Sequence, residues 1–105
     1  MGTEVRVCST SDVPAPSSRR FDLDGHRLCV VHLDDDWYAI GDRCSHADWS
    51  LSEGDLWVEE REIECPKHGS TFDLKTGEPL ALPATKPVPV YDVRVEGDDV
   101  LVTLP

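Results

Sequence analysis

The chain has 105 residues, which is enough for one modest hydrophobic core and too few for two independent domains. Twenty-one acidic residues against ten basic ones give a formal charge of −11. Such a surface repels nucleic acid and anionic membranes and suits a protein partner with a basic docking face, unless the acidity serves only solubility. No apolar run approaches the roughly 18 residues of a membrane span, and the first residues lack the apolar core of a secretory signal. We therefore expect a cytoplasmic protein.

Short apolar segments separated by turn residues predict a series of strands. Asp24-Gly25 is typical of a tight hairpin turn between two of them, and Pro14 and Pro16 interrupt the chain after the first. In chain order, strands are expected at residues 5–7, 20–23, 26–33, 37–40, 56–58, 63–65, 72–74, 90–95 and 100–104.

Sustained apolar spacing of 3.6 residues is missing, so long helices are not expected. Residues 42–55 are polar, and residues 79–89 contain four prolines. The sequence thus predicts a single all-β domain over residues 1–105. In it a loop-rich subdomain at about 42–85 would sit on a framework formed by residues 1–41 and 86–105.

Four cysteines would suggest disulfides in a secreted protein, but nothing in the sequence indicates secretion, so reduced thiols are expected. Cys8 and Cys29 lie in predicted strands among apolar neighbours and are interpreted as buried small hydrophobic residues. Cys44 and Cys65 lie in polar loops, where their thiols are available to bind metal.

Two mixed pairs of metal-binding residues stand out: Cys44-Ser45-His46 and Cys65-Pro66-Lys67-His68, with eighteen residues between His46 and Cys65. Two ferric ions and two sulfides carry a net charge of two plus. Two thiolates and two neutral imidazoles therefore bring an oxidised [2Fe–2S] site to zero, and one electron takes it to minus one. A four-thiolate site must go from minus two to minus three, so the mixed site accepts an electron more easily.

The imidazoles would mark the outer iron, because that iron has no anionic protein ligand. Their free ring nitrogens could face solvent and give an electron a short path to a docked partner. The main alternative is structural zinc, which two cysteines and two histidines can also hold. Zinc fingers usually pair cysteine with cysteine and histidine with histidine, whereas here each loop is mixed and no helix is expected after His68. This favours the cluster.

At these residues the chain resembles the Rieske ferredoxin family, and the resemblance runs along nearly the whole chain. The similar stretches are residues 38–46 before and through the first pair, Leu51-Ser52-Glu53-Gly54, residues 65–73 around the second pair, and the proline loop at 82–88. The resemblance implies a Rieske fold with an antiparallel β-sandwich or barrel-like base. It also implies one [2Fe–2S] cluster held by Cys44, His46, Cys65 and His68.

The chain departs from the Rieske proteins of respiratory complexes in ways that matter for redox chemistry. Those proteins carry an extra cysteine in each ligand loop, joined as a disulfide, and this chain has neither. They also have a tyrosine where Phe72 stands, with its hydroxyl directed at a ligand sulfur. Fewer hydrogen bonds to sulfur predict a potential near the low end of the Rieske range, about −150 mV, although Ser70 remains as one possible donor.

The resemblance is to the soluble ferredoxins of bacterial ring-hydroxylating dioxygenases. It implies an electron carrier, not itself an enzyme, that passes electrons from a flavin-dependent NAD(P)H reductase to a terminal non-haem iron oxygenase. A second hypothesis is a ferredoxin serving SUF-type cluster assembly or redox sensing, because the acidic chain also resembles those of actinobacteria. A monomer is expected for a small carrier.

Four aromatic or charged side chains and two histidines outside the ligand pairs have alternative interpretations, namely Trp37, Trp49, Trp57, Lys67, His26 and His32. Trp37 and Trp57 alternate with polar residues and are interpreted as core. Trp49 lies three residues after His46 and either shields the cluster or offers an exposed aromatic ring to a partner. Lys67, between Cys65 and His68, either adjusts the local field, forms part of a docking rim, or is an ordinary solvated lysine. His26 and His32 are expected to face solvent or to pair across strands.

Overall fold

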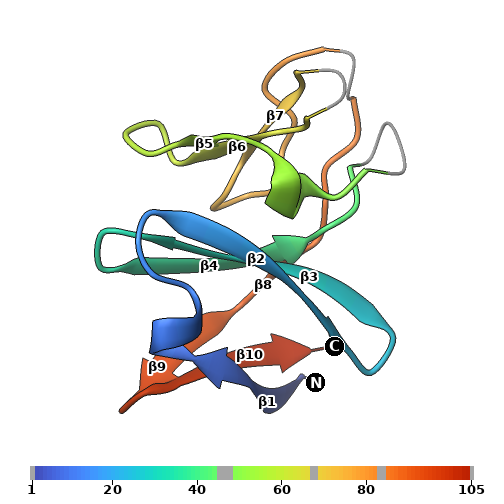
Figure 1. Cartoon of the computed structure of the whole chain (residues 1–105). Coiled ribbons are helices and arrows are strands. Elements are labelled where there is room, and N and C mark those ends of the chain that lie inside the picture. Colours follow the sequence, from blue (N-terminus) through green and yellow to red (C-terminus); the bar gives the residue numbers. More distant parts are fainter. Residues whose placement is uncertain (1, 45–48, 67–68, 83–84, 105) are drawn as a thin grey trace.

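The computed structural model describes residues 2–44, 49–66, 69–82 and 85–104. Its strands form three antiparallel sheets, stacked as layers in Figure 1. The strands are β1 (Thr3–Ser9), β2 (Ser17–Leu23), β3 (His26–Leu33), β4 (Asp36–Gly41), β5 (Leu56–Trp57), β6 (Glu62–Glu64), β7 (Thr71–Asp73), β8 (Val90–Tyr91), β9 (Val93–Glu96) and β10 (Asp99–Leu104).

The all-β prediction is confirmed. Two short 3-10 turns, η1 (Thr10–Asp12) and η2 (Leu51–Glu53), are the helical elements of the described ranges. Within those ranges, no helix is long and apolar enough to cross a membrane.

The middle sheet, in the order β2-β3-β4-β8, separates the lower sheet β1-β10-β9 from the upper sheet β5-β6-β7 (Figure 1). Successive side chains of a strand point to opposite faces of its sheet, so β3 contributes side chains to the cores on both sides of the middle sheet. Leu28 and Val30 pack in clusters with residues of the lower sheet, whereas Cys29 and Val31 belong to a cluster shared with the upper sheet. This explains why β3 reads as a continuous apolar run: the middle sheet is covered on both faces.

The last predicted hairpin differs from the observed structure in one respect. Residues 90–95 were expected to form one strand, but the chain changes sheets at Asp92. Before it, Val90 and Tyr91 pair with β4 in the middle sheet. After it, β9 pairs with β10 in the lower sheet. A single segment thus joins two layers, which local sequence pattern cannot reveal.

The two strand tryptophans are less buried than expected. Trp57 is 47% exposed, so its assignment to the core is wrong. It lies on the two-residue strand β5, where its indole N–H donates to a Glu64 carboxylate oxygen at 3.2 Å. Trp37 is half-buried and stacks on its cross-strand partner His32, with ring centroids 3.9 Å apart. That contact agrees with the cross-strand pairing expected for His32.

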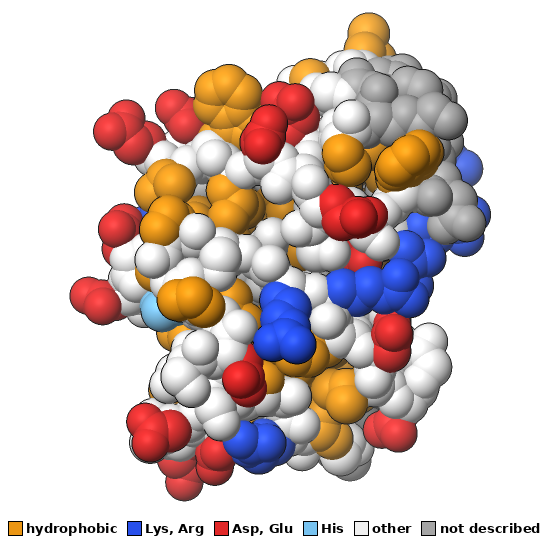
Figure 2. Space-filling model, in the orientation of Figure 1, with side chains coloured by type: hydrophobic (Ala, Val, Ile, Leu, Met, Phe, Trp, Pro, Cys, Tyr) orange, Lys and Arg blue, Asp and Glu red, His pale blue; other side chains and the backbone are white. Residues whose placement is uncertain are grey.

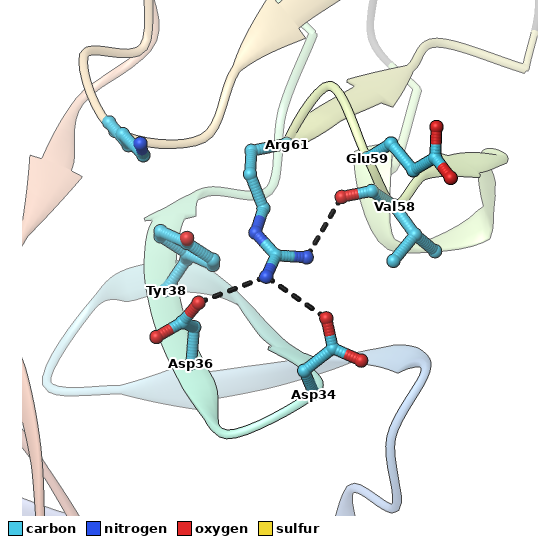
Figure 3. A pocket seen from close by; sticks show the side chains of 7 residues that line it. Asp34, Asp36, Tyr38, Val58, Glu59 and Arg61 are labelled. Atoms are coloured by element: carbon cyan, nitrogen blue, oxygen red, sulfur yellow. Dashed lines mark hydrogen bonds and ion pairs between the residues drawn. The ribbon is translucent and has the colours of Figure 1, made fainter.

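Arg61 fastens the upper sheet to the middle sheet (Figure 3). It lies in the turn between β5 and β6 with a left-handed φ of 58°, which is uncommon for a residue with a side chain. Its guanidinium donates to Asp34 at 3.1 Å, in the turn between β3 and β4, to Asp36 at 3.0 Å, at the start of β4, and to the Val58 carbonyl. These residues line a polar pocket, and their contacts hold the two layers together at the end of the hairpins.

Candidate metal centre

Cys44 lies at the base of a loop that leaves the middle sheet and returns to it. Its backbone N–H donates to the Trp49 carbonyl at 2.9 Å, and Arg43 forms an isolated antiparallel bridge with Ser50. One step further out, the Asp42 carbonyl accepts a hydrogen bond from the Leu51 N–H at 2.7 Å. These successive contacts fix both ends of the first ligand loop.

Cys65 follows β6 and begins a tight turn. Its N–H donates to the Ser70 carbonyl at 2.7 Å, and its own carbonyl accepts from the Gly69 N–H at 3.0 Å. Gly69 has a φ of 73°, a backbone conformation in which side chains are strained. The Cys-Pro-Lys-His-Gly order therefore suits the geometry: glycine stands where the chain reverses.

The two ligand loops approach each other at Gly54. A Cβ atom added there would lie 1.7 Å from the Glu64 carbonyl oxygen, the residue just before Cys65. The Glu64 N–H also donates to the Asp55 carbonyl at 2.8 Å. Only glycine permits this contact, so the Leu51-Ser52-Glu53-Gly54 stretch brings the end of one loop against the start of the other.

The proline-rich segment is tied to both neighbouring layers. The Val88 N–H donates to the Gly77 carbonyl at 2.9 Å, and the Gly41 N–H donates to the Pro89 carbonyl at 2.9 Å. At Gly77, with a φ of 77°, a Cβ atom would lie 2.2 Å from the Val88 carbonyl oxygen. This segment therefore runs directly beside the end of β4, from which the first ligand loop starts.

Cys44 and Cys65 both lie in the core between the middle and upper sheets. Cys44 and Cys65 are 2% and 0% exposed, and both belong to the cluster that includes Ile63 and Phe72. Neither forms a disulfide. Two unlinked thiols from two rigid loops, withdrawn from water in one apolar cluster, are a donor pair that fits the thiolate-bound iron of a [2Fe–2S] cluster.

The two histidine candidates, His46 and His68, lie outside the described residues, as does Lys67. In the ranges that are described, no group of three or more histidine, cysteine, aspartate or glutamate side chains is arranged to hold a metal. The four-residue ligand set thus remains a prediction; of its members, Cys44 and Cys65 lie in the same buried cluster.

Cys8 and Cys29 are buried, as expected, at 3% and 0% exposure. Burial raises the pKa of both thiols, and for Cys29 the rise is large. Both thiols are therefore protonated and unreactive at neutral pH.

Trp49 is 41% exposed, which favours the presented ring over the shield. Phe72 and Ser70 are both fully buried, so the pair that replaces the tyrosine-and-serine arrangement is enclosed by protein.

Sequence reasoning missed Asp42. It lies within residues 38–46, which lead into the first ligand loop, and the sequence pattern alone assigns it no role. Its carboxylate is completely buried, with Arg20 and Arg27 each 3.9 Å away. A possible signal was the position of a charged residue directly after an apolar strand and two residues before Cys44.

Figure 2 shows that Lys and Arg side chains gather on the right, level with the middle layer, while Asp and Glu are prominent at the left and lower edges.

An all-β scaffold with two buried cysteines outside any disulfide, at the starts of two turn-rich loops, is compatible with an iron–sulfur protein. The sequence matches the Rieske [2Fe-2S] domain over residues 3–92. The chain therefore belongs to the Rieske [2Fe–2S] family, whose cofactor is a [2Fe–2S] cluster.

Within the Rieske family, the chain is similar to ferredoxin subunits of dioxygenases. The chain is 42% identical over 101 residues to the 3-phenylpropionate/cinnamic acid dioxygenase ferredoxin subunit of Escherichia coli (strain K12), covering 96% of this chain and 93% of that one. It is 44% identical to the ferredoxin of carbazole 1,9a-dioxygenase from Nocardioides aromaticivorans IC177, with a TM-score of 0.91 and coverage of 95% and 96%.

A third match, at 39% identity and a TM-score of 0.86, is to a structure described as the complex of reduced oxygenase and oxidized ferredoxin in carbazole 1,9a-dioxygenase, covering 94% of this chain and 91% of that one. The relatives are electron-transfer subunits, and this chain is likewise an electron-transfer component, not itself the catalyst.

Proposed function

We propose that Cys44, His46, Cys65 and His68 hold one [2Fe–2S] cluster, and that the chain uses it to carry single electrons between two enzymes of an aromatic-ring dioxygenase system. The donor would be a flavin-dependent NAD(P)H reductase and the acceptor a terminal non-haem iron oxygenase. The observation that carries the proposal is the pair of buried thiols on two loops fixed by backbone hydrogen bonds, Cys44 to Trp49 and Cys65 to Ser70.

Each ligand type has a distinct task in this proposal. The bound cluster supplies a one-electron couple. Cys44 and Cys65 bind as thiolates, whose negative charge is balanced inside the core by iron. His46 and His68 would hold the other iron as neutral rings, so that iron would have no anionic protein ligand and would be the easier one to reduce. The cluster-binding region is about 42–85, and residues 1–41 and 86–105 support it.

The partner assignment is supported by the names of the relatives, which are ferredoxins of dioxygenases that act on aromatic compounds. One of them is described together with its oxygenase. The alternative role, in cluster assembly or redox sensing, has no such support among these relatives. A cytoplasmic monomer suits a carrier that must meet two partners in turn.

The decisive experiment is low-temperature EPR of protein reduced with dithionite, combined with iron and acid-labile sulfide analysis. We expect two irons and two sulfides per chain and a [2Fe–2S] signal with the low average g value of mixed histidine and cysteine ligation. A four-thiolate signal would refute the ligand set. Stoichiometric zinc, without iron or sulfide in protein prepared anaerobically, would refute the whole proposal.

The partner assignment needs its own measurement. Reduced protein is mixed anaerobically with a purified ring-hydroxylating oxygenase, and reoxidation is followed by visible absorbance. A second mixture contains a cluster-assembly scaffold protein in place of the oxygenase. We expect rapid electron transfer to the oxygenase and slow electron transfer to the scaffold protein. Faster electron transfer to the scaffold protein than to the oxygenase would instead assign the chain to cluster assembly. It would leave the ligand assignment unchanged.

A further inference from the structure

We propose that Asp42 is the positioning residue of the first ligand loop and also sets the redox potential of the centre. One carboxylate oxygen holds the base of the loop in place by accepting a hydrogen bond from the Ser52 N–H, a contact called the pin below. The other oxygen places a buried negative charge beside the loop. The inference rests on the proposed function, because it takes Cys44 to be a cluster ligand.

The pin is visible in the hydrogen bonds around Asp42. Its Oδ1 atom accepts from the Ser52 N–H at 2.8 Å, and its backbone carbonyl accepts from the Leu51 N–H at 2.7 Å. Its own N–H donates to the Arg27 carbonyl of β3 at 3.0 Å. Asp42 thus ties the outgoing end of the loop to its returning end and to the middle sheet. The loop between these ties carries Cys44.

The charge is visible in what surrounds the second oxygen. Asp42 is 0% exposed, and Oδ2 has no hydrogen-bond partner among the described residues. The Arg20 Nε and Arg27 Nη2 atoms each lie 3.9 Å from it, which is too long for a hydrogen bond but close enough for strong Coulomb attraction. A carboxylate needed only as a pin would not require this second, charged environment, since an asparagine oxygen could accept the Ser52 N–H.

The field of this carboxylate extends into the core that holds the proposed ligands. After burial itself, the Asp42 charge is the next cause that raises the pKa of the Cys29 thiol. Cys29 belongs to the same buried cluster as Cys44 and Cys65. Along the chain, Asp42 and Cys44 are two residues apart, so their Cα atoms are separated by at most about 7 Å.

A fixed anion at this place opposes the arrival of an electron. Two unit charges about 10 Å apart at an effective dielectric constant near 20 interact strongly enough to change a one-electron equilibrium about tenfold. Asp42 therefore lowers the potential of the centre, and the opposite charges of Arg20 and Arg27 act to raise it.

The test compares midpoint potentials of the purified holoprotein, measured by redox titration with EPR detection. Asp42→Asn keeps an oxygen acceptor for Ser52 and removes the charge. At a fixed ambient potential its ratio of reduced to oxidised protein should rise about tenfold, which is a shift of 59 mV. Asp22→Asn is the matched control: Asp22 contacts the same Arg20 at 3.2 Å, but its side chain is 62% exposed, so its shift should be several-fold smaller.

Two further variants separate the two roles. Arg20→Gln removes a flanking positive charge from a half-exposed site and should move the ratio in the opposite direction, which keeps the electrostatic claim testable if Asp42→Asn folds poorly. Asp42→Ala removes the pin as well as the charge. It should lose iron to a chelator several times faster than wild type, whereas Asp42→Asn should lose it at nearly the wild-type rate.

The outcomes are distinguishable. If wild type shows the mixed-ligand signal and the potentials of Asp42→Asn and Asp22→Asn shift equally, or Arg20→Gln leaves the potential unchanged, the charge role is refuted. Equal iron loss from Asp42→Ala and Asp42→Asn refutes the pin. A wild type without a [2Fe–2S] signal refutes the proposed function and this inference with it.

Discussion

Gly54 makes a tight backbone contact between the segment that follows the first ligand loop and the strand that leads to the second, so a single methyl group there should separate them. In Gly54→Ala, the new Cβ atom would lie 1.7 Å from the Glu64 carbonyl oxygen and 2.9 Å from its carbon. Ordinary contact begins near 3.4 Å, so the loops must move apart by more than an ångström. The backbone φ of −85° is acceptable for alanine, which makes the penalty purely steric.

Both neighbouring groups are main-chain atoms of a paired strand, which cannot turn away as a flexible side chain would. We therefore place the cost at the upper end for overpacking, about 3 kcal/mol. For a domain of this size, that lowers the thermal midpoint by roughly 15 °C. The cluster content of the purified protein should fall as well, because the displaced segments lead directly to Cys44 and Cys65.

Gly25→Ala is the matched control. Gly25 has a φ of 80° but nothing within 4 Å of the added methyl group, so this variant carries conformational strain without a clash. Its cost should be about 1 kcal/mol, and its iron content should equal that of wild type. Thermal melting followed by circular dichroism, with iron analysis before each melt, measures both quantities. If Gly54→Ala melts within a few degrees of Gly25→Ala and keeps its iron, the close approach of the loops does not hold the centre together.

Three further predictions concern potential and pH. His68→Cys should lower the midpoint potential, because a third thiolate adds one negative charge; an unchanged value would argue against His68 as a ligand. Phe72→Tyr should raise the potential from its expected value near −150 mV by offering a hydroxyl to a ligand sulfur, and a redox titration with no shift would show that the hydroxyl does not reach it. The hydrogen bond from Arg94 lowers the pKa of Glu4 from 4.5, so its stabilisation is present above that pH and is lost as pH falls through the lower, folded-state pKa. Glu4→Gln should therefore melt below wild type at neutral pH and approach it in acid, and a constant difference would contradict the assignment.

Local sequence pattern was sufficient for much of the framework. The run at residues 26–33 and the Asp24-Gly25 turn predicted β3 and its hairpin, and the structure pairs Leu23 with His26 across that turn. The same reasoning could not see that β3 is covered on both faces, because burial on a second face depends on which segment returns over it. Nor could it see the change of sheets at Asp92, which is set by two partners far apart in the chain.

The site divides in a similar way. Cysteine and histidine spacing was enough to select the candidate ligands, since those residue types are rare and their chemistry is specific. Asp42 and Gly54 are common residue types, and their importance comes from tertiary contacts with Ser52 and Glu64. Trp57 was misassigned for the same reason: alternation in a strand indicates one buried face, but a two-residue strand at the edge of a small sheet has little to cover it.

The two ends of the described chain meet in the lower sheet, where Thr3 pairs with Leu104 (Figure 1). Cys44 and Cys65 belong to the buried cluster between the middle and upper sheets, on the other side of the middle sheet. Surface termini that lie close together are favourable places for covalent attachment. A reductase or an electrode linker fused at either end would therefore be tethered at the far side of the protein, leaving the loop side open to the opposite electron-transfer partner.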